Sequence, residues 1–343
     1  MSDVAPPAPT ERGWGKLLLA LAAFLFLPHY FPLLRALLPV EDTLLLLLPA
    51  IAACCLVGWW AGGRVWLALL WLGIAIAILS RPGSPGSFYN LERGWCLLLA
   101  GAFGLISLFG MHRPFFNRAL TAAGLTLALV LAMSLRGPFT PSRARAALEA
   151  ELKVRHTSTM SFMRTYVREN APAKQTSDVA PLLDEVDKGL RATSEGAIGL
   201  APSLLLLQSL LALALAWTTY HRIARTRLGP PLGPLKDFRF NDQLVWGLIA
   251  GLAIVFVPGL DFMNDVGRNL LLFFGALYAI RGLGVLSWFM SPGAFTTTLV
   301  VGFFMLWWPV LNAVAFALLA LAAFGLGLGD TWADWRRRAR PTT

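Results

Sequence analysis

The chain has 343 residues, of which 57% are hydrophobic and only 14% charged, and its formal net charge is +10. Soluble domains carry about 25% charged residues, and a chain this apolar could not cover a water-facing surface. The composition therefore excludes a soluble globular protein. The positive charge is expected to be the loop bias of a membrane protein, and no nucleic-acid partner is expected.

The apolar residues come in blocks, several of which reach the roughly 17–25 residues that cross a hydrocarbon core of about 30 Å. A spanning segment must pair its own backbone groups, and the alternating pattern of a barrel strand is missing, so we predict helices. In chain order, the first eight predicted spans are 16–38, 43–60, 64–80, 94–111, 117–135, 197–220, 243–260 and 267–290.

The last apolar block runs from Phe295 to Leu328. As one helix it would be about 51 Å long at 1.5 Å per residue, which is too long for a single crossing. Pro309 and Asn312 lie near its middle and favour two short spans. The predicted fold is an all-α polytopic membrane protein with about ten transmembrane helices, and nine is the alternative.

Between the fifth and sixth spans lies a polar segment, residues 136–196, which mixes 10 Lys and Arg with 8 Asp and Glu. Apolar residues recur in it at helical spacing, and Ala171–Pro172 divides it, so two amphipathic helices are predicted. They form either a hairpin that lies against the membrane or a partner, or a simple connector.

The Lys and Arg of the short loops set the orientation. With ten spans, one side collects 14 of them, including those of the loop 222–239 and the tail 336–340, and the other side collects 4. Both termini are therefore predicted to be cytoplasmic and residues 136–196 extracytoplasmic. The predicted parts are a tail (1–15), a membrane half of about five spans (16–135), the extracytoplasmic segment (136–196), a second membrane half of about five spans (197–328) and a basic tail (329–343).

Enzyme signatures such as HExxH, GxGxxG and GxSxG are missing, and the histidines are scattered, so we expect no catalytic residue, metal or cofactor. Gly327-Leu328-Gly329-Asp330 spells the GxGD string of intramembrane aspartyl proteases. That chemistry needs two carboxylates that share a proton, and no earlier span contains a second aspartate. Asp330 is expected to be solvated at the end of its span.

Arg281 lies well inside a predicted span, where it costs at least about 2.5 kcal/mol unless it faces a partner or water. Asp261 and Asp265 lie too near the outer end, so Asn312 or a carbonyl near Pro309 is the expected neighbour. Arg281 either contacts a buried anion or serves as a structural hydrogen-bonding residue. Small residues nearby predict close helix packing or, alternatively, room for a ligand: Gly247, Gly251, Gly282 and Gly284.

Three stretches of the C-terminal third carry a family resemblance: Phe238–Trp246 (FRFNDQLVW), Asn269–Leu271 (NLL) and Leu277–Val285 (LYAIRGLGV). They resemble the YybS-like bacterial membrane proteins, classed as domain of unknown function 2232 (DUF2232), over about residues 235–325. That family is distantly similar to the membrane-embedded substrate-binding subunits of energy-coupling-factor vitamin transporters.

The resemblance implies a protein of the bacterial inner membrane that binds a small molecule on its outer side and works with an ATPase-coupled module. The candidate substrate-binding residues are Asp242, Asn269, Tyr278, Arg281 and Asn312. The alternative is a structural or assembly subunit of a larger membrane complex, which docks other subunits through residues 136–196.

Overall fold

The computed structural model describes residues 14–30, 40–81, 87–110, 113–136, 140–170, 173–290, 294, 297–298 and 309–338. The regular secondary structure of this part is helical, and it divides into two compact units. Unit 1 comprises residues 1–198 and 208–231, and unit 2 comprises residues 199–207 and 232–343.

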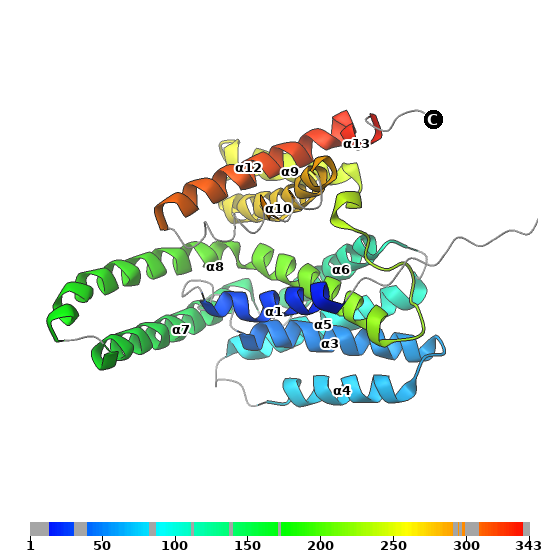
Figure 1. The fold of residues 1–343 in the computed structure, drawn as a ribbon, viewed down its shortest axis with the longest axis horizontal. Helices are drawn as coiled ribbons and strands as arrows, with labels where there is room; N and C mark the ends of the chain where they lie inside the picture. Colours follow the sequence, from blue (N-terminus) through cyan, green and yellow to red (C-terminus); the bar gives the residue numbers. More distant parts are fainter. Residues whose placement is uncertain are drawn as a thin grey trace, which may run out of the picture. The chain divides into compact units, whose positions relative to one another are not determined.

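Seven helices lie wholly or mostly in unit 1 among the described residues (Figure 1): α1 (Trp14–Tyr30), α3 (Val40–Trp60), α4 (Val65–Leu79), α5 (Ser87–Phe109), α6 (Phe115–Arg136), α7 (Pro141–Asn170) and α8 (Ala173–Ile223). Residues 199–207 of α8 belong to unit 2. α3 packs against α1, α4 and α5. Its buried side is built of small residues such as Ala50, Ala53 and Cys54, which let neighbouring helices approach closely.

Unit 2 contains four α-helices among its described residues: α9 (Val245–Phe256), α10 (Asn264–Phe289), α12 (Pro309–Ala333) and the short α13 (Trp335–Arg338). Three 3₁₀ turns connect them: η1 (Leu235–Asp237), η2 (Asp242–Leu244) and η3 (Asp261–Met263). α10 lies at the centre, with α9 and α12 packed against it.

Five described helices are long and apolar enough to cross a membrane, namely Asp42–Trp60, Phe88–Phe109, Phe115–Leu135, Ile198–Ile223 and Asp261–Phe289. Four shorter apolar helices accompany them: Trp14–Phe26, Val65–Leu79, Asp242–Phe256 and Leu318–Ala333. The described residues thus have the helical, membrane-protein character that the composition predicts. The number of ten spans stays a prediction.

α10 and α12 run in the same direction (Figure 1), as two contacts between them show. Tyr278 of α10 packs on Phe324 of α12, and Arg281, further along α10, pairs with Asp330, further along α12. Helices joined by a tight turn run antiparallel. The parallel packing therefore fits the predicted additional span between them. Residues 299–308, which would form most of that span, lie outside the described part of the chain.

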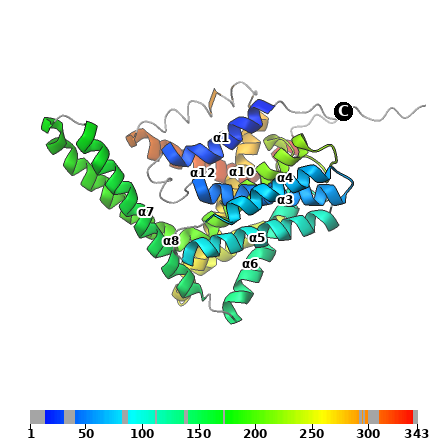
Figure 2. The same ribbon diagram turned by 90° about the horizontal axis from the view of Figure 1, so that it is seen from below.

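The polar segment forms a helical hairpin of α7 and the first half of α8, and Figure 2 shows the two side by side. Residues 171–172, where a break was predicted, lie outside the described residues. α8 continues unbroken into the predicted span 197–220 and has 51 residues. At 1.5 Å per residue it is about 76 Å long, more than twice a hydrocarbon core of about 30 Å, so its polar half extends beyond the membrane.

Candidate functional site

A buried ion-pair network lies at one end of unit 2, where α9 begins and α10 and α12 approach their ends. Arg281 donates from Nε to Oδ2 of Asp330 at 3.0 Å and from Nη1 to Oδ1 of Asp242 at 2.6 Å. Its Nη2 donates to the backbone oxygen of Asp330 at 3.2 Å. The Arg281 side chain is only 3% exposed, so the protein satisfies this guanidinium internally, as a buried cation requires.

Arg336 completes the network from α13. Its Nη2 lies 2.5 Å from Oδ2 of Asp330, and its Nη1 donates to the backbone oxygens of Lys236 and Phe238. Two arginines and two aspartates make the network formally neutral. It ties α10, α12, α13 and the chain around η1 together at one end of unit 2.

Asp330 was expected to be solvated, and that expectation was wrong. Its side chain is 0% exposed and lies between the guanidinium groups of Arg281 and Arg336. Asp242 and Asp330 both bind Arg281, so a cation separates these two carboxylates. The two acids of an aspartyl protease instead share a proton.

The structure brings three of the predicted substrate-binding residues together: Asp242, Tyr278 and Arg281. Tyr278 is fully buried, and its ring packs edge-on against Phe240 with 5.0 Å between the ring centres. Its hydroxyl oxygen has no hydrogen-bond partner among the described residues. The Arg281 guanidinium lies 5.4 Å from the centre of the Phe240 ring, within the range of a cation–π contact.

Asn269 and Asn312 do not join this network. Asn269 lies 12 residues before Arg281 on α10, about 18 Å away along the helix, and it binds residues 199–207 through Ser203 and Gly199. Asn312 was the expected neighbour of Arg281, and this was wrong because Asp330 holds that place. Asn312 precedes Asp330 by 18 residues of α12, or about 27 Å, and its side chain lies outside the described residues.

The four predicted packing glycines all lie where helices or turns of unit 2 approach closely. A Cβ atom on Gly282 would overlap the backbone oxygen of Ala323, and one on Gly247 would overlap the Phe274 ring. On Gly251 it would come within 3.1 Å of the backbone oxygen of Gly267, and on Gly284 within 2.5 Å of that of Leu235. These contacts fit the role in packing rather than open space for a ligand.

Arg118 is one of the 14 Lys and Arg that were assigned to short loops when the orientation was predicted. This assignment was wrong, because the structure buries Arg118 completely in α6 of unit 1. Its guanidinium lies 4.2 Å from the centre of the Trp217 ring, and Nη1 donates to the backbone oxygen of Leu228 at 3.0 Å. Nε and Nη2 find no hydrogen-bond partner within the described part of the chain. The position of Arg118 four residues into an apolar helix was the available signal for burial.

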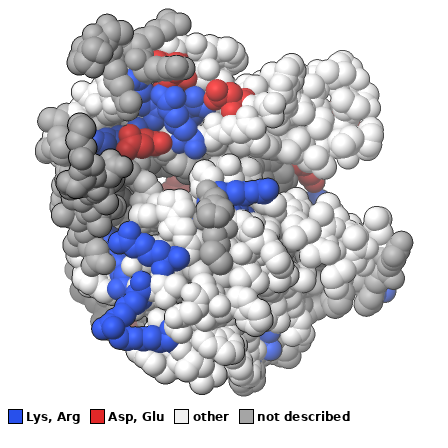
Figure 3. All heavy atoms as spheres, turned by 90° about the vertical axis from the view of Figure 1, so that its right-hand side faces the viewer, with Lys and Arg blue, Asp and Glu red and all other residues white. Residues whose placement is uncertain are grey.

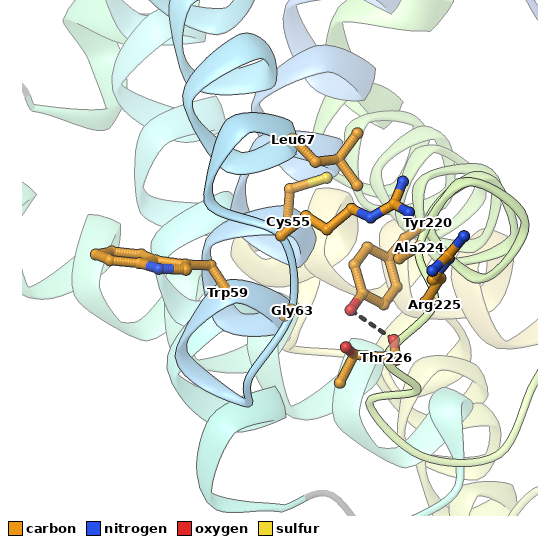
Figure 4. A pocket seen from close by; sticks show the side chains of 10 residues that line it. Cys55, Trp59, Gly63, Leu67, Tyr220, Ala224, Arg225 and Thr226 are labelled. Atoms are coloured by element: carbon orange, nitrogen blue, oxygen red, sulfur yellow. Dashed lines mark hydrogen bonds between the residues drawn. The ribbon is translucent and has the colours of Figure 1, made fainter.

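A pocket of unit 1 is too small for a metabolite. It lies between the end of α3, the start of α4 and the chain after α8, with Tyr220 donating to the backbone oxygen of Thr226 at 2.7 Å (Figure 4). Its volume of about 10 Å³ is at the lower limit for one water molecule. The pocket therefore supports no small-molecule site.

The hairpin is anchored to the apolar helices of unit 1 by Arg155 of α7. Its Nη1 lies 2.9 Å from Asp42 at the start of α3, and its Nε lies 2.8 Å from Glu151. Burial lowers the pKa of Arg155, but the neighbouring carboxylates outweigh this and the net shift is upward, so the anchoring residue keeps its charge.

These observations define a multi-pass α-helical membrane protein. Residues 119–327 match the family described as predicted membrane protein (DUF2232), and the chain belongs to this family. The match begins in α6 and includes the hairpin, so it extends further upstream than the resemblance over about residues 235–325. No curated protein and no solved structure matches the chain.

Proposed function

We propose that the protein is a non-catalytic assembly subunit of a membrane complex, which docks another membrane protein through the hairpin. The observation that carries this proposal is the exposure of large apolar side chains on the hairpin. Phe162 and Tyr166 of α7 are 57% and 59% exposed, and Leu182 of α8 is 58% exposed. Exposed apolar faces of this kind mark interaction surfaces.

The apolar face on α7 has helical spacing. Val154, Ser158, Phe162 and Tyr166 are four residues apart and share one exposed face of the helix. The rings of Phe162 and Tyr166 stack with 6.4 Å between their centres. A helix of a partner with its own apolar face is the chemistry that this surface fits.

We place the hairpin outside the cytoplasm of a bacterial inner-membrane protein with about ten spans. Within unit 1, the hairpin contacts the start of α3 through the Arg155–Asp42 ion pair. The opposite end of unit 1 is where α3 ends, and there Gly63 lies beside Thr226. The exposed basic residues at that second end are Arg64, Arg113, Arg225 and Arg227. Figure 3, which views the molecule from the right-hand side of Figure 1, shows Lys and Arg gathered there. The positive-inside rule supports a cytoplasmic location for this end of unit 1, and we propose that both termini are cytoplasmic as well.

Copurification tests the docking proposal. The double variant Phe162→Glu, Tyr166→Glu is expected to lose its partner when the protein is purified in mild detergent from native membranes, because two charges would be buried unpaired in the interface. Lys153→Glu, at an exposed position outside the apolar face, is the matched control and should keep the partner. Retention by the double variant, with unchanged thermal stability, would contradict the proposal.

Small-molecule binding of the kind found in transporter substrate-binding subunits is the second candidate, and one observation favours it. The Asp242 side chain is 60% exposed, yet it covers Nη1 of the buried Arg281. A carboxylate or phosphate ligand could take its place. We rank this function second because the network is already neutral and, in the proposed orientation, lies at the cytoplasmic end and not at an outer pocket.

The assembly function and the small-molecule-binding function predict different effects of anions on the melting temperature. If Arg281 accepts an anionic ligand, succinate or inorganic phosphate should raise the melting temperature of Asp242→Asn more than that of the wild type, because bound ligand stabilises the folded state. Chloride at equal ionic strength is the control. If Arg281 is structural, as the assembly proposal holds, neither anion will distinguish the variant from the wild type.

A further inference from the structure

Arg118 of α6 has an unpaired hydrogen-bonding edge inside unit 1. Its guanidinium is fully buried, lies 4.2 Å from the centre of the Trp217 ring and donates from Nη1 to the backbone oxygen of Leu228 at 3.0 Å. Nε and Nη2 have no hydrogen-bond partner among the described residues. These two nitrogens form one side of the planar guanidinium, and such a pair of N–H groups binds two oxygens of a carboxylate or phosphate.

Arg281 of unit 2 shows what such a buried cation needs. Its Nε donates to Asp330 and its Nη1 to Asp242, so carboxylates balance its charge. A buried charge that is neither paired nor fully hydrogen-bonded is strongly unfavourable. Within the described part of the chain, Arg118 lacks the anionic partner that Arg281 has.

The described helices around Arg118 contribute no acidic side chain to its surroundings. Asp and Glu are missing from three stretches that form most of α3 to α6 and the end of α8: residues 43–91, 93–136 and 196–231. Arg118 lies beside Gly110, just after α5, with its Cδ atom 3.9 Å from where a Cβ would stand. Glu92, near the start of α5, precedes Phe109 at its end by 17 residues, or about 26 Å. An anion from outside the chain is thus the partner that fits this edge.

The surroundings of the unpaired edge are basic instead. The Cδ atom of Arg113 also lies beside Gly110, 3.6 Å from the same Cβ position. Arg227 directly precedes Leu228, whose backbone oxygen Arg118 binds. Arg113 and Arg227 are exposed, so their positive charges attract an anion to this end of unit 1.

This end of unit 1 also has the aromatic side chains of a membrane interface. Trp59 and Trp60 end α3, Trp66 lies at the start of α4, and all three are 47–76% exposed. Exposed Trp residues mark the level of the lipid headgroups. Arg118 lies three residues after the start of α6, about 4.5 Å along the helix. The unpaired edge is therefore close to the depth of the lipid phosphates.

We propose that unit 1 binds a phosphate group at Arg118, and that an anionic membrane lipid supplies it. Two phosphate oxygens accept hydrogen bonds from Nε and Nη2, and the exposed Arg113 and Arg227 contact the headgroup from outside. Because the guanidinium is buried, entry of the phosphate requires residues 224–230, which follow α8 and form no helix, to move away from α6. The site is independent of the docking function, because the hairpin contacts the other end of α3.

Native mass spectrometry of the purified protein with added phosphatidylglycerol tests this site. Arg118→Lys keeps the positive charge but loses the two parallel N–H groups. Loss of one hydrogen bond to a charged group weakens binding roughly tenfold or more, so the half-saturating concentration for the first bound lipid should rise by that factor. Arg225→Lys, at an exposed position of the same end, is the matched control and should bind like the wild type.

Inorganic phosphate separates the two sources of this chemistry. With a lipid as the ligand, sodium phosphate should displace no more phosphatidylglycerol from the wild type than sodium chloride does at equal ionic strength. Stronger displacement by phosphate would overturn the lipid as the ligand and support a soluble phosphate at the same edge.

Equal weakening by Arg118→Lys and Arg225→Lys would indicate diffuse attraction and overturn the site, as would unchanged binding by folded Arg118→Lys. If Arg118→Lys does not fold, the structure of the wild type in phosphatidylglycerol nanodiscs decides. Phosphate oxygens about 2.7–3.2 Å from Nε and Nη2 are expected, and any other atoms on this edge would overturn the proposal.

Discussion

Asp330→Asn is expected to destabilise unit 2 by about 3–5 kcal/mol, because breaking a buried ion pair leaves uncompensated charge. The substitution removes the carboxylate between Arg281 and Arg336, whose side chains are 3% and 4% exposed. Two buried cations would then keep only Asp242 as a carboxylate partner within the network. Thermal unfolding of the purified protein in detergent, followed by tryptophan fluorescence, measures the effect.

The ion-pair network also predicts which substitutions destabilise unit 2 more and which destabilise it less. Arg281→Leu should cost less than Asp330→Asn, because Asp330 keeps Arg336 as its partner. Asp334→Asn is the control at the same end of α12. Asp334 pairs with Arg239 at 2.6 Å, but the two side chains are 32% and 43% exposed, and an exposed pair contributes only about 0–1 kcal/mol. If Asp330→Asn unfolds at the same temperature as Asp334→Asn, the network does not hold unit 2 together.

Gly282→Ala is expected to be destabilising, at the upper end of the roughly 1–3 kcal/mol that overpacking costs. The added methyl group would overlap the backbone oxygen of Ala323, and one on Gly327 would overlap that of Tyr278. Backbone atoms cannot rotate away as a side chain can, so α10 and α12 would have to separate. Such a separation would also strain the Arg281–Asp330 pair.

Two other glycines of the same helices provide the control for this prediction. A Cβ atom on Gly275 of α10 or on Gly325 of α12 would meet nothing within 4 Å. Since alanine favours a helix over glycine by about 1 kcal/mol, Gly275→Ala and Gly325→Ala should be neutral or stabilising in the same melting experiment. Equal destabilisation by Gly275→Ala and Gly282→Ala would contradict the close crossing.

The helical membrane architecture could be predicted from the sequence because it depends on block length and on the cost of unpaired backbone in lipid. The polar segment was also predicted to be two helices. That the second of them continues into the following span was not foreseen. The composition changes from polar to apolar near residue 197, but nothing there breaks a helix, and α8 runs on through the change.

The partners of Arg281 could not be predicted, because they come from positions 39 residues before it and 49 residues after it. The sequence shows that a buried arginine needs a partner, but packing decides which acid reaches it. Asp330 was assigned to solvent because it ends an apolar block close to an Arg-rich tail. One arginine of that tail, Arg336, instead helps to bury it.

The sequence also did not show which apolar residues of the hairpin are exposed. Helical spacing predicted the amphipathic character of residues 136–196, but several of their apolar side chains face outward. Leu152 and Met160 are buried, whereas Phe162 and Tyr166, at nearby positions on α7, are more than half exposed. Only the structure separates the apolar residues that are buried in the hairpin from those that stay exposed.

The docking function is tested most directly by a photocrosslinking scan of α7 in living cells. A photoreactive phenylalanine analogue would replace, one at a time, Lys153, Ser158, Phe162, Arg164 and Tyr166. Crosslinked products are expected at 158, 162 and 166 and none at 153 or 164, because the apolar face recurs every four residues. Crosslinks at 153 and 164 alone, or at none of the five positions in stable protein, would contradict it.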